Sequence, residues 1–153
     1  MKKIFNLFLM MAIATTISLT SCKTEGCTDP TATNYDEKAD TDDGTCTFER
    51  DAFLGTYNNC VDNCVAGDSF SMTVSAASEN TSTISISNFA GFGSAYSIKA
   101  TVSGSSLTLM SGSLGTGITL LSGSGSLNGN ILTILYTYED EFGTESCSIT
   151  ATI

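Results

Sequence analysis

The segment LNGNILTILYTY (residues 127–138) decides how the main part of this chain folds. Asn128-Gly129 is the best hairpin turn in the sequence, and the apolar residues that follow it recur with a period of two. Side chains at alternate positions of a strand point to the same face, so this pattern predicts a strand with one buried and one solvated face. The apolar positions are Leu132, Ile134, Tyr136 and Tyr138.

The same alternation of apolar with polar residues runs from Phe53 to the end of the chain. Ser and Thr occupy many of the intervening positions, and turns that contain Gly or Asn separate the runs. The pattern predicts an all-β fold over residues 53–153, with about eight antiparallel strands in an up-and-down meander that forms a small barrel or a sandwich. The apolar positions of the other runs are Phe70, Met72, Val74, Ile84, Ile86, Tyr96, Ile98, Ala100, Val102, Leu107, Leu109, Cys147, Ile149, Ala151 and Ile153.

A small barrel either fills its interior with side chains or holds one small ligand. Many residues between Ser103 and Gly129 are Gly or Ser, so few bulky side chains are present there to fill the interior. This composition favours a cavity or a flattened, sandwich-like barrel. Five aromatic residues are candidates for lining such a cavity: Tyr96, Tyr136, Tyr138, Phe89 and Phe92.

The two ends of this region resemble known domains. The opening FLGTY (residues 53–57) has a Gly-x-aromatic in its first strand and resembles lipocalin-like domains. The repeated hairpins and the closing SCSIT (residues 146–150) resemble a flavobacterial lipoprotein domain. Tyr57 stands where these domains have tryptophan, and the resemblance implies that its ring plugs one end of the barrel.

The first 21 residues have the layout of a secretory signal, with two lysines, an apolar run over residues 4–19 and small residues at its end. A membrane-spanning helix needs about 20 apolar residues, and this run is shorter. Leu19-Thr20-Ser21-Cys22 resembles the lipobox of bacterial lipoproteins. The resemblance implies cleavage before Cys22, a diacylglyceryl group on its sulfur and an acyl chain on its new amine. We expect residues 22–25 to tether the chain to the outer membrane, on its periplasmic or cell-surface face.

Residues 26–48 (GCTDPTATNYDEKADTDDGTCTF) form a loop-rich segment with few apolar side chains. Cys27 and Cys46 bracket it, and a disulfide between them would stabilise a loop of this length by about 3 kcal/mol. Through GCTD, AxNY and DDGxC the segment resembles a short cysteine-bracketed motif of secreted and surface proteins of Bacteroidetes, with Thr33 where the family often has a further cysteine. Residues 49–52 are expected to be a charged connector to the β domain of residues 53–153.

The cysteine-bracketed segment is also rich in side-chain oxygens. Calcium takes six to eight oxygen ligands, and short Asp-rich loops with glycine supply them. An EF-hand would need a downstream bidentate Glu, which is absent at the required spacing. A solvated acidic loop, in which Asn and Asp cap turns, is the alternative interpretation. The candidate calcium ligands are Asp29, Asn34, Asp36, Asp40, Asp42 and Asp43.

The remaining cysteines point to a second disulfide, because an exported chain meets an oxidising compartment. The lipoprotein-domain resemblance implies that Cys147 in the last strand pairs with Cys64 or, alternatively, with Cys60. A Cys60–Cys64 disulfide stays open, and it would leave Cys147 free in a strand. The spacing of Cys60 and Cys64 also suits a metal, but tetrahedral zinc needs four ligands and the chain has no histidine. With Cys22 lipidated, one thiol remains unpaired.

Composition excludes several functions. Removal of residues 1–21 leaves four basic and sixteen acidic side chains, a formal net charge of −12, so the chain should repel nucleic acid and anionic lipid head groups. The absence of histidine excludes a Ser-His-Asp triad and a Cys-His dyad. Glu139-Asp140-Glu141 and Glu145 could serve glycosidase chemistry if two carboxylates were held about 5–10 Å apart in a cleft. A solvated hairpin turn is the simpler interpretation of this cluster.

These observations predict a membrane-anchored lipoprotein that acts without catalysis as a binding or structural module of the cell envelope. We assign no catalytic residue and no cofactor apart from the candidate calcium. The specific form of this hypothesis is a module that binds a small apolar ligand in the barrel mouth, and a closed barrel with an apolar cavity would support it. The alternative is a surface that binds a protein partner or inhibits a peptidase, which a filled barrel with an apolar outer patch would support. A glycan-active enzyme is the third hypothesis.

Overall fold

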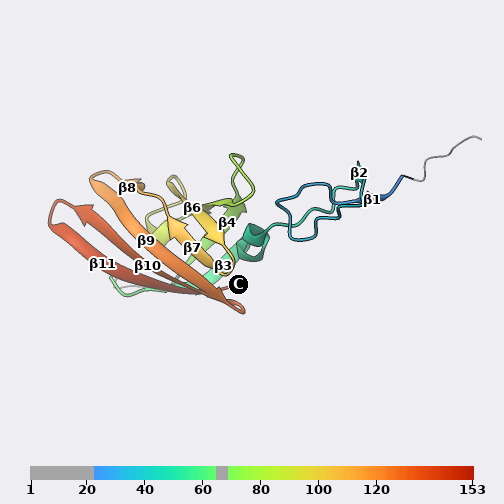
Figure 1. The fold of residues 1–153 in the computed structure, drawn as a ribbon. Coiled ribbons are helices and arrows are strands. Elements are labelled where there is room, and N and C mark those ends of the chain that lie inside the picture. The colour runs from blue at the N-terminus through green and yellow to red at the C-terminus, as the bar shows by residue number, and fades with distance from the viewer. Residues whose placement is uncertain (1–22, 65–68) are drawn as a thin grey trace, which may run out of the picture.

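The computed structural model describes residues 23–64 and 69–153, and it is an all-β molecule built around a closed, eight-stranded antiparallel barrel (Figure 1). The predicted fold class is therefore confirmed, as a barrel and not a sandwich. The barrel strands are β3 (Gly55–Asp62), β4 (Phe70–Ala76), β5 (Thr83–Ser87), β6 (Ser97–Ser103), β7 (Ser106–Leu109), β9 (Ile118–Asn128), β10 (Ile131–Asp140) and β11 (Gly143–Thr152).

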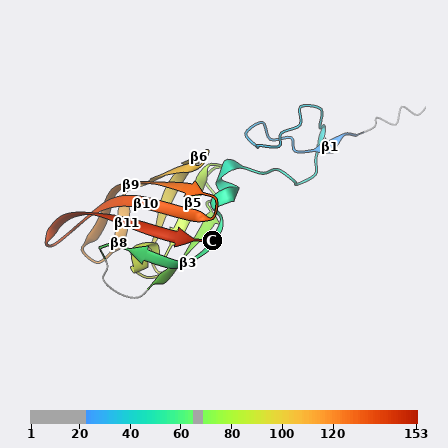
Figure 2. The same ribbon diagram turned by 90° about the horizontal axis from the view of Figure 1, so that it is seen from below.

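The barrel strands follow one another as an up-and-down meander, and the first strand closes against the last. β3 pairs with β4 on one side and with β11 on the other, so the two ends of the meander lie side by side (Figure 2). A ninth strand, β8 (Gly112–Gly115), is inserted between β7 and β9. β8 pairs with the first part of β9, and β7 pairs with the later part. β7 and β8 therefore lie one after the other along the same edge of β9.

The period-two pattern produces the core. Ile86 faces Val74 on one neighbouring strand and Ile98 on the other, and Ile134 faces Ile149 across β10 and β11. These side chains point inward and are buried, while the Ser and Thr between them face water. The expectation is wrong at two positions at strand ends. Tyr96 and Ile153 are exposed because β6 begins at Ser97 and β11 ends at Thr152.

The interior beside β9 is filled, so the expectation of a cavity there, which came from the Gly-rich and Ser-rich sequence, is wrong. Gly123 and Gly125 point inward, and leucines from β7 take the space that side chains would have used. A β-carbon on Gly123 would lie 2.5 Å from Leu109 Cδ1, and one on Gly125 would lie 3.2 Å from Leu107 Cδ1. Many core side chains have no exposed surface at all, so they contact no void that could hold water. The largest are Phe53, Tyr57, Met72, Ile84, Ile86, Leu120, Leu132, Ile134 and Ile149.

The hairpin between β9 and β10 is present, but its turn is shifted by one residue from Asn128-Gly129. Asn128 pairs with Ile131, so the two-residue loop is Gly129-Asn130. Gly129 has φ of +58°, a left-handed conformation that glycine adopts without strain. Glycine at the first loop position is the arrangement of a type II′ turn, which suits the twist of a hairpin. The Asn-Gly pair therefore predicted the existence of the hairpin correctly, but it predicted the wrong two residues for the loop.

Residues 23–48 form a small unit of turns to one side of the barrel (Figure 1). Its regular structure is a two-residue parallel pair, β1 (Glu25–Gly26) with β2 (Thr41–Asp42). A disulfide joins Cys27 to Cys46 and closes the segment. The expected staple is therefore present, and hydrogen bonds such as Thr33 N–H to the Thr47 carbonyl and Asp36 N–H to the Cys27 carbonyl hold the turns together beside it.

The connector after this unit is docked onto the barrel. Residues 49–52 belong to the 3₁₀ helix η1 (Glu49–Phe53), whose Arg50 side chain is mostly buried. Arg50 Nη1 donates hydrogen bonds to the carbonyl oxygens of Ala77 and Thr83, at 2.8 and 3.0 Å, and to that of Asn80. Phe53 then enters the core at the barrel end, so the chain meets the barrel at a fixed position. Within the described residues, no helix has the length and apolarity required to cross a membrane.

Candidate functional site

The second disulfide lies where the two ends of the barrel meander meet. Cys64 follows the end of β3 and is bonded to Cys147 in β11, and Cys60 is a free, fully buried thiol. Of the pairings that the sequence left open, the structure therefore has Cys64 with Cys147. Burial raises the pKa of the Cys60 thiol, so it is kept as the unreactive neutral form. The predicted lipidation site, Cys22, lies outside the described residues.

The six candidate calcium ligands do not converge on a common site in this structure. Asp29 accepts hydrogen bonds from the backbone N–H and the hydroxyl of Thr31, and Asp43 accepts the same pair from Thr45. These bonds lower the pKa of both carboxyl groups. Asn34 bridges the chain by donating to the Thr45 carbonyl and accepting from the N–H of Thr47.

The other three carboxylates of the segment are used in the same way. Asp36 accepts from the N–H of Lys38, Asp40 from that of Thr24 and Asp42 from that of Gly44. Short polar side chains that bond to nearby backbone in this way shape turns. In this structure the Asp-rich sequence builds turns, and calcium binding by these residues stays a prediction.

The acidic residues of the β10–β11 hairpin are likewise exposed or used locally. Asp140 Oδ1 accepts from the N–H groups of Phe142 and Gly143, at 2.8 and 3.2 Å, and so caps the turn. Glu145 accepts from the hydroxyl of Tyr138 at 3.0 Å. Asp140 and Glu141 border a small depression at the hairpin tip, beside Phe142, whose side chain is almost fully exposed. This arrangement is that of a solvated turn.

Four of the five aromatic residues expected to line a cavity instead pack together at one end of the barrel, and the fifth, Tyr96, is exposed. Phe89 belongs to the short 3₁₀ turn η2 (Phe89–Gly91), and its ring contacts Tyr136 edge to face with 5.0 Å between centroids. Tyr138 stacks on Tyr136 and meets Phe92 at 6.2 Å. Such contacts stabilise aromatic pairs beyond the area that they bury. The prediction that these rings line a cavity is wrong, because they pack against one another.

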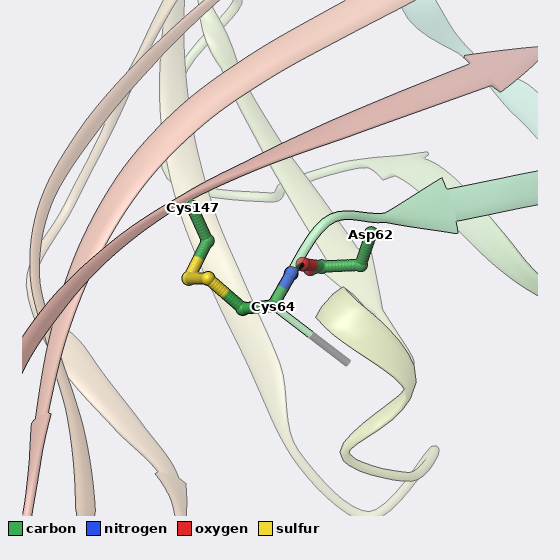
Figure 3. Close-up of side chains that lie close together, drawn as sticks. All are labelled: Asp62, Cys64 and Cys147. Carbon is green, nitrogen blue, oxygen red and sulfur yellow. Dashed lines mark hydrogen bonds between the residues drawn. A yellow bond between two sulfur atoms is a disulfide. The ribbon is translucent and has the colours of Figure 1, made fainter. Parts of the chain in front are cut away.

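A buried carboxylate lies at this aromatic end of the barrel and was not expected from the sequence. Asp62 is only 6% exposed, and its Oδ2 accepts a hydrogen bond of 2.6 Å from the hydroxyl of Tyr136. Its Oδ1 accepts one of 2.8 Å from the backbone N–H of Cys64. The carboxylate also lies beside the Cys64–Cys147 disulfide (Figure 3). The sequence gives no signal for it, because an unbroken alternation from Tyr57 would place Asp62 on the outward face of the strand.

Replacement of Tyr136 by phenylalanine is expected to lower the free energy of unfolding by about 2 kcal/mol, because a buried carboxylate then loses a hydrogen-bond donor. Burial and the neighbouring Asp62 carboxylate raise the pKa of Tyr136 far above its ordinary value near 10. The unfolded chain therefore releases this proton at a lower pH than the folded chain does. Stability should fall as the pH rises above about 10, by about 1.4 kcal/mol per pH unit for each such tyrosine.

Urea unfolding at neutral pH and between pH 10 and 12 measures both effects. Tyr136→Phe should be less stable at neutral pH and should lose stability less steeply at alkaline pH. Tyr138→Phe is the matched control, because the partner of that hydroxyl, Glu145, is exposed and its loss should cost under about 1 kcal/mol. Equal effects of the two variants would contradict a special role for the Asp62–Tyr136 pair.

The outer surface of the barrel carries a second candidate site, a shallow depression of about 600 Å³ that we call the outer-face groove. Leu135 of β10 lies at its centre and is 59% exposed, with Ser124 of β9 opposite it on one side and Ser148 of β11 on the other. Among residues 23–64 and 69–153, no charged side chain lines the groove. Its lining residues are Asn63, Ser122, Gly123, Ser124, Leu135, Tyr136, Thr137, Ser146, Cys147 and Ser148.

The fold and these two sites define the molecule as a closed, filled β-barrel with a buried polar cluster at one end and a neutral groove on its outer wall. No protein-family model, no curated protein and no solved structure matches this chain.

Proposed function

We propose that this protein is a non-catalytic binding module of the cell envelope, held at a membrane by a lipid on Cys22, and that it binds a partner protein through the outer-face groove. The observation that carries the proposal is the groove itself, an open depression that no charged side chain of the described part of the chain lines, in a protein with sixteen acidic and only six basic residues. The proposal takes the protein-directed form of the binding module because the barrel interior is packed.

The absence of charge in the groove favours a docking surface. The fully buried part of a protein interface is depleted in charged residues, because each buried charge must be stripped of water. The carboxylates of this protein lie mainly in residues 23–51 and in the β10–β11 hairpin. The groove is therefore a part of the surface that a neutral or acidic partner can approach closely without strong repulsion.

Aliphatic side chains add apolar area to the same wall of the barrel. Leu135 and Ile131 project from the outer face of β10, and Val61 projects from β3, two strands away across β11. Each is at least half exposed. Thr133 and Thr150 lie between them in register. Exposed aliphatics at this density, mixed with hydroxyl groups that can donate and accept, fit a polypeptide partner.

The position of the groove suits a tethered protein. The chain enters the barrel at Gly55, the start of β3, whereas Asn63 of the groove follows the opposite end of that strand. In chain order the disulfide-stapled unit of residues 23–48 separates the proposed anchor from the barrel, and it lies to one side of the barrel (Figure 2). We infer that this unit acts as a spacer, with the groove on the half of the barrel that is farther from the tether.

A photoreactive amino acid at Leu135, introduced in intact cells, should give a covalent adduct with one partner protein. The same group at Ser75, an exposed position on β4, is the matched control and should give none. Addition of Cys22→Ser to the Leu135 variant should release the protein from the membrane fraction and abolish the adduct. Absence of an adduct at Leu135, or equal labelling at Ser75, would contradict the docking surface, and unchanged membrane association of Cys22→Ser would contradict the anchor.

A further inference from the structure

The barrel end where β3 meets β11 gathers three groups that bind metal ions. One carboxylate oxygen of Asp62 and the sulfurs of Cys64 and Cys147 all lie within 4.8 Å of one another (Figure 3). No other group of three His, Cys, Asp or Glu side chains in residues 23–64 and 69–153 comes this close together. Asp62 and Cys147 are buried and Cys64 is half-buried, so the three groups form a built site and not an accidental surface cluster.

We propose that reduction of the Cys64–Cys147 disulfide converts this cluster into a binding site for a thiophilic divalent cation such as Zn²⁺. A dithiol reductant supplies two electrons and two protons, the S–S bond breaks, two thiols form and the reductant becomes a disulfide. Binding of the cation then displaces the two thiol protons to solvent, and two thiolates and the Asp62 carboxylate coordinate it. In the oxidised protein the sulfurs are bonded to each other, so neither is available as a thiolate ligand.

The ligand set matches the chemistry of such a cation. Thiolates and carboxylates are both common ligands of Zn²⁺, at about 2.3 Å from sulfur and about 2.0–2.2 Å from oxygen. Three protein ligands leave the fourth tetrahedral position open to water. Two thiolates, one carboxylate and a divalent cation leave the cluster with a net charge of −1, the same as that of the Asp62 carboxylate in the oxidised protein, so binding the ion adds no net charge to this buried position.

The surroundings of Asp62 already orient it as a ligand. The N–H of Cys64 and the hydroxyl of Tyr136 each bond to a different carboxylate oxygen, so each oxygen keeps one lone pair for the ion. Hydrogen bonds of this kind position metal ligands and tune their affinity.

The sulfurs must separate from bonding distance to about 3.8 Å to bind one tetrahedral ion, as the Zn–S distance requires. Cys64 lies beyond the last residue of β3, so it can move without breaking the strand. Cys64 is half-buried whereas Cys147 is 4% exposed, so a reductant would reach the disulfide from the Cys64 side.

The test uses Co²⁺ as a spectroscopic substitute for Zn²⁺, because thiolate ligation gives it a charge-transfer absorption. Purified protein is titrated anaerobically with Co²⁺, before and after reduction with a phosphine. We expect the absorption band only in the reduced protein, and we expect it to saturate at one Co²⁺ ion per chain. Asp62→Asn should weaken the affinity about tenfold or more. Cys64→Ser should remove the saturable band.

Two matched variants separate this site from the other thiols of the chain. Cys60→Ala removes a buried thiol of the same strand that lies outside the cluster, and Cys27→Ser with Cys46→Ser removes the staple. Both should retain the band. The proposal is overturned if reduced protein gives no band, if the band survives Asp62→Asn and Cys64→Ser unchanged, or if it disappears with the staple. It is also overturned if reduction abolishes the circular dichroism of the barrel and Co²⁺ does not restore it.

Discussion

Replacement of Cys64 and Cys147 together by alanine is expected to lower the free energy of unfolding of the barrel by about 4.5 kcal/mol. The disulfide joins residues 83 apart, and in the chain-entropy model a loop of this length is among those that stabilise most. It also joins β3 to β11, the first and last strands of the meander, whose pairing closes the barrel. Without the cross-link, this closure must be made between the two ends of an otherwise unrestrained unfolded chain.

Urea unfolding followed by far-ultraviolet circular dichroism measures this loss as a shift of the midpoint to lower urea at an unchanged slope. The matched control is the double replacement of Cys27 and Cys46 by alanine. That disulfide closes a loop of 19 residues outside the barrel, so its removal should loosen residues 23–48 and leave the barrel transition in place. Equal shifts of the midpoint in the two double variants would contradict a special role of the Cys64–Cys147 bond in closing the barrel.

Gly125→Val is expected to destabilise the barrel by about 3 kcal/mol or more, because the interior beside β9 has no room for a side chain. A β-carbon at Gly125 would lie 2.8 Å from the carbonyl oxygen of Thr133 and 3.1 Å from a side-chain carbon of Ile134. The first contact is with backbone of the neighbouring strand, which cannot move aside without disturbing the pairing of β9 with β10.

Ser124→Val is the matched control for this prediction. Ser124 is the preceding residue of β9, faces outward and is exposed, so the same new side chain should change stability by under about 0.5 kcal/mol. Thermal or urea unfolding of the two variants gives the comparison directly. A Gly125→Val protein as stable as the wild type would mean that the interior holds free space, and the interpretation of the barrel as a container for an apolar ligand would then regain its support.

Several features that the sequence did not predict share one physical origin, which is a change in strand register. Tyr57 and Cys60 both face inward although they are three residues apart, because β3 has a bulge between them, where Asn59 has φ of +52°. The bulge shifts the inward positions from odd to even numbers. It buries Cys60 in the core, buries Asp62 beside Tyr136 and brings Cys64 to Cys147. A pattern of period two cannot reveal such a shift.

A second bulge has the same effect on the wall that carries the groove. Thr137 pairs with Ser122 and Tyr138 with Leu120, so Leu121 is an extra residue in β9. From this point onward the glycines of β9 face inward, and Ser122 and Ser124 face outward. The glycines whose small size favoured an empty interior are therefore the residues of β9 against which Leu107 and Leu109 pack. Its serines become the lining of the outer-face groove.

The sequence by itself determined the all-β class, the number of barrel strands, most core positions and the Cys27–Cys46 staple. Each depends on local properties, because the direction of a side chain along a strand follows from the backbone and a short loop brings its own ends together. Only the tertiary structure decided that the barrel is closed and filled, that Cys64 and not Cys60 bonds to Cys147, and that Asp62 lies buried beside that bond. Those outcomes depend on bulges and on contacts between β3 and β11, at opposite ends of the barrel meander, which local periodicity does not encode.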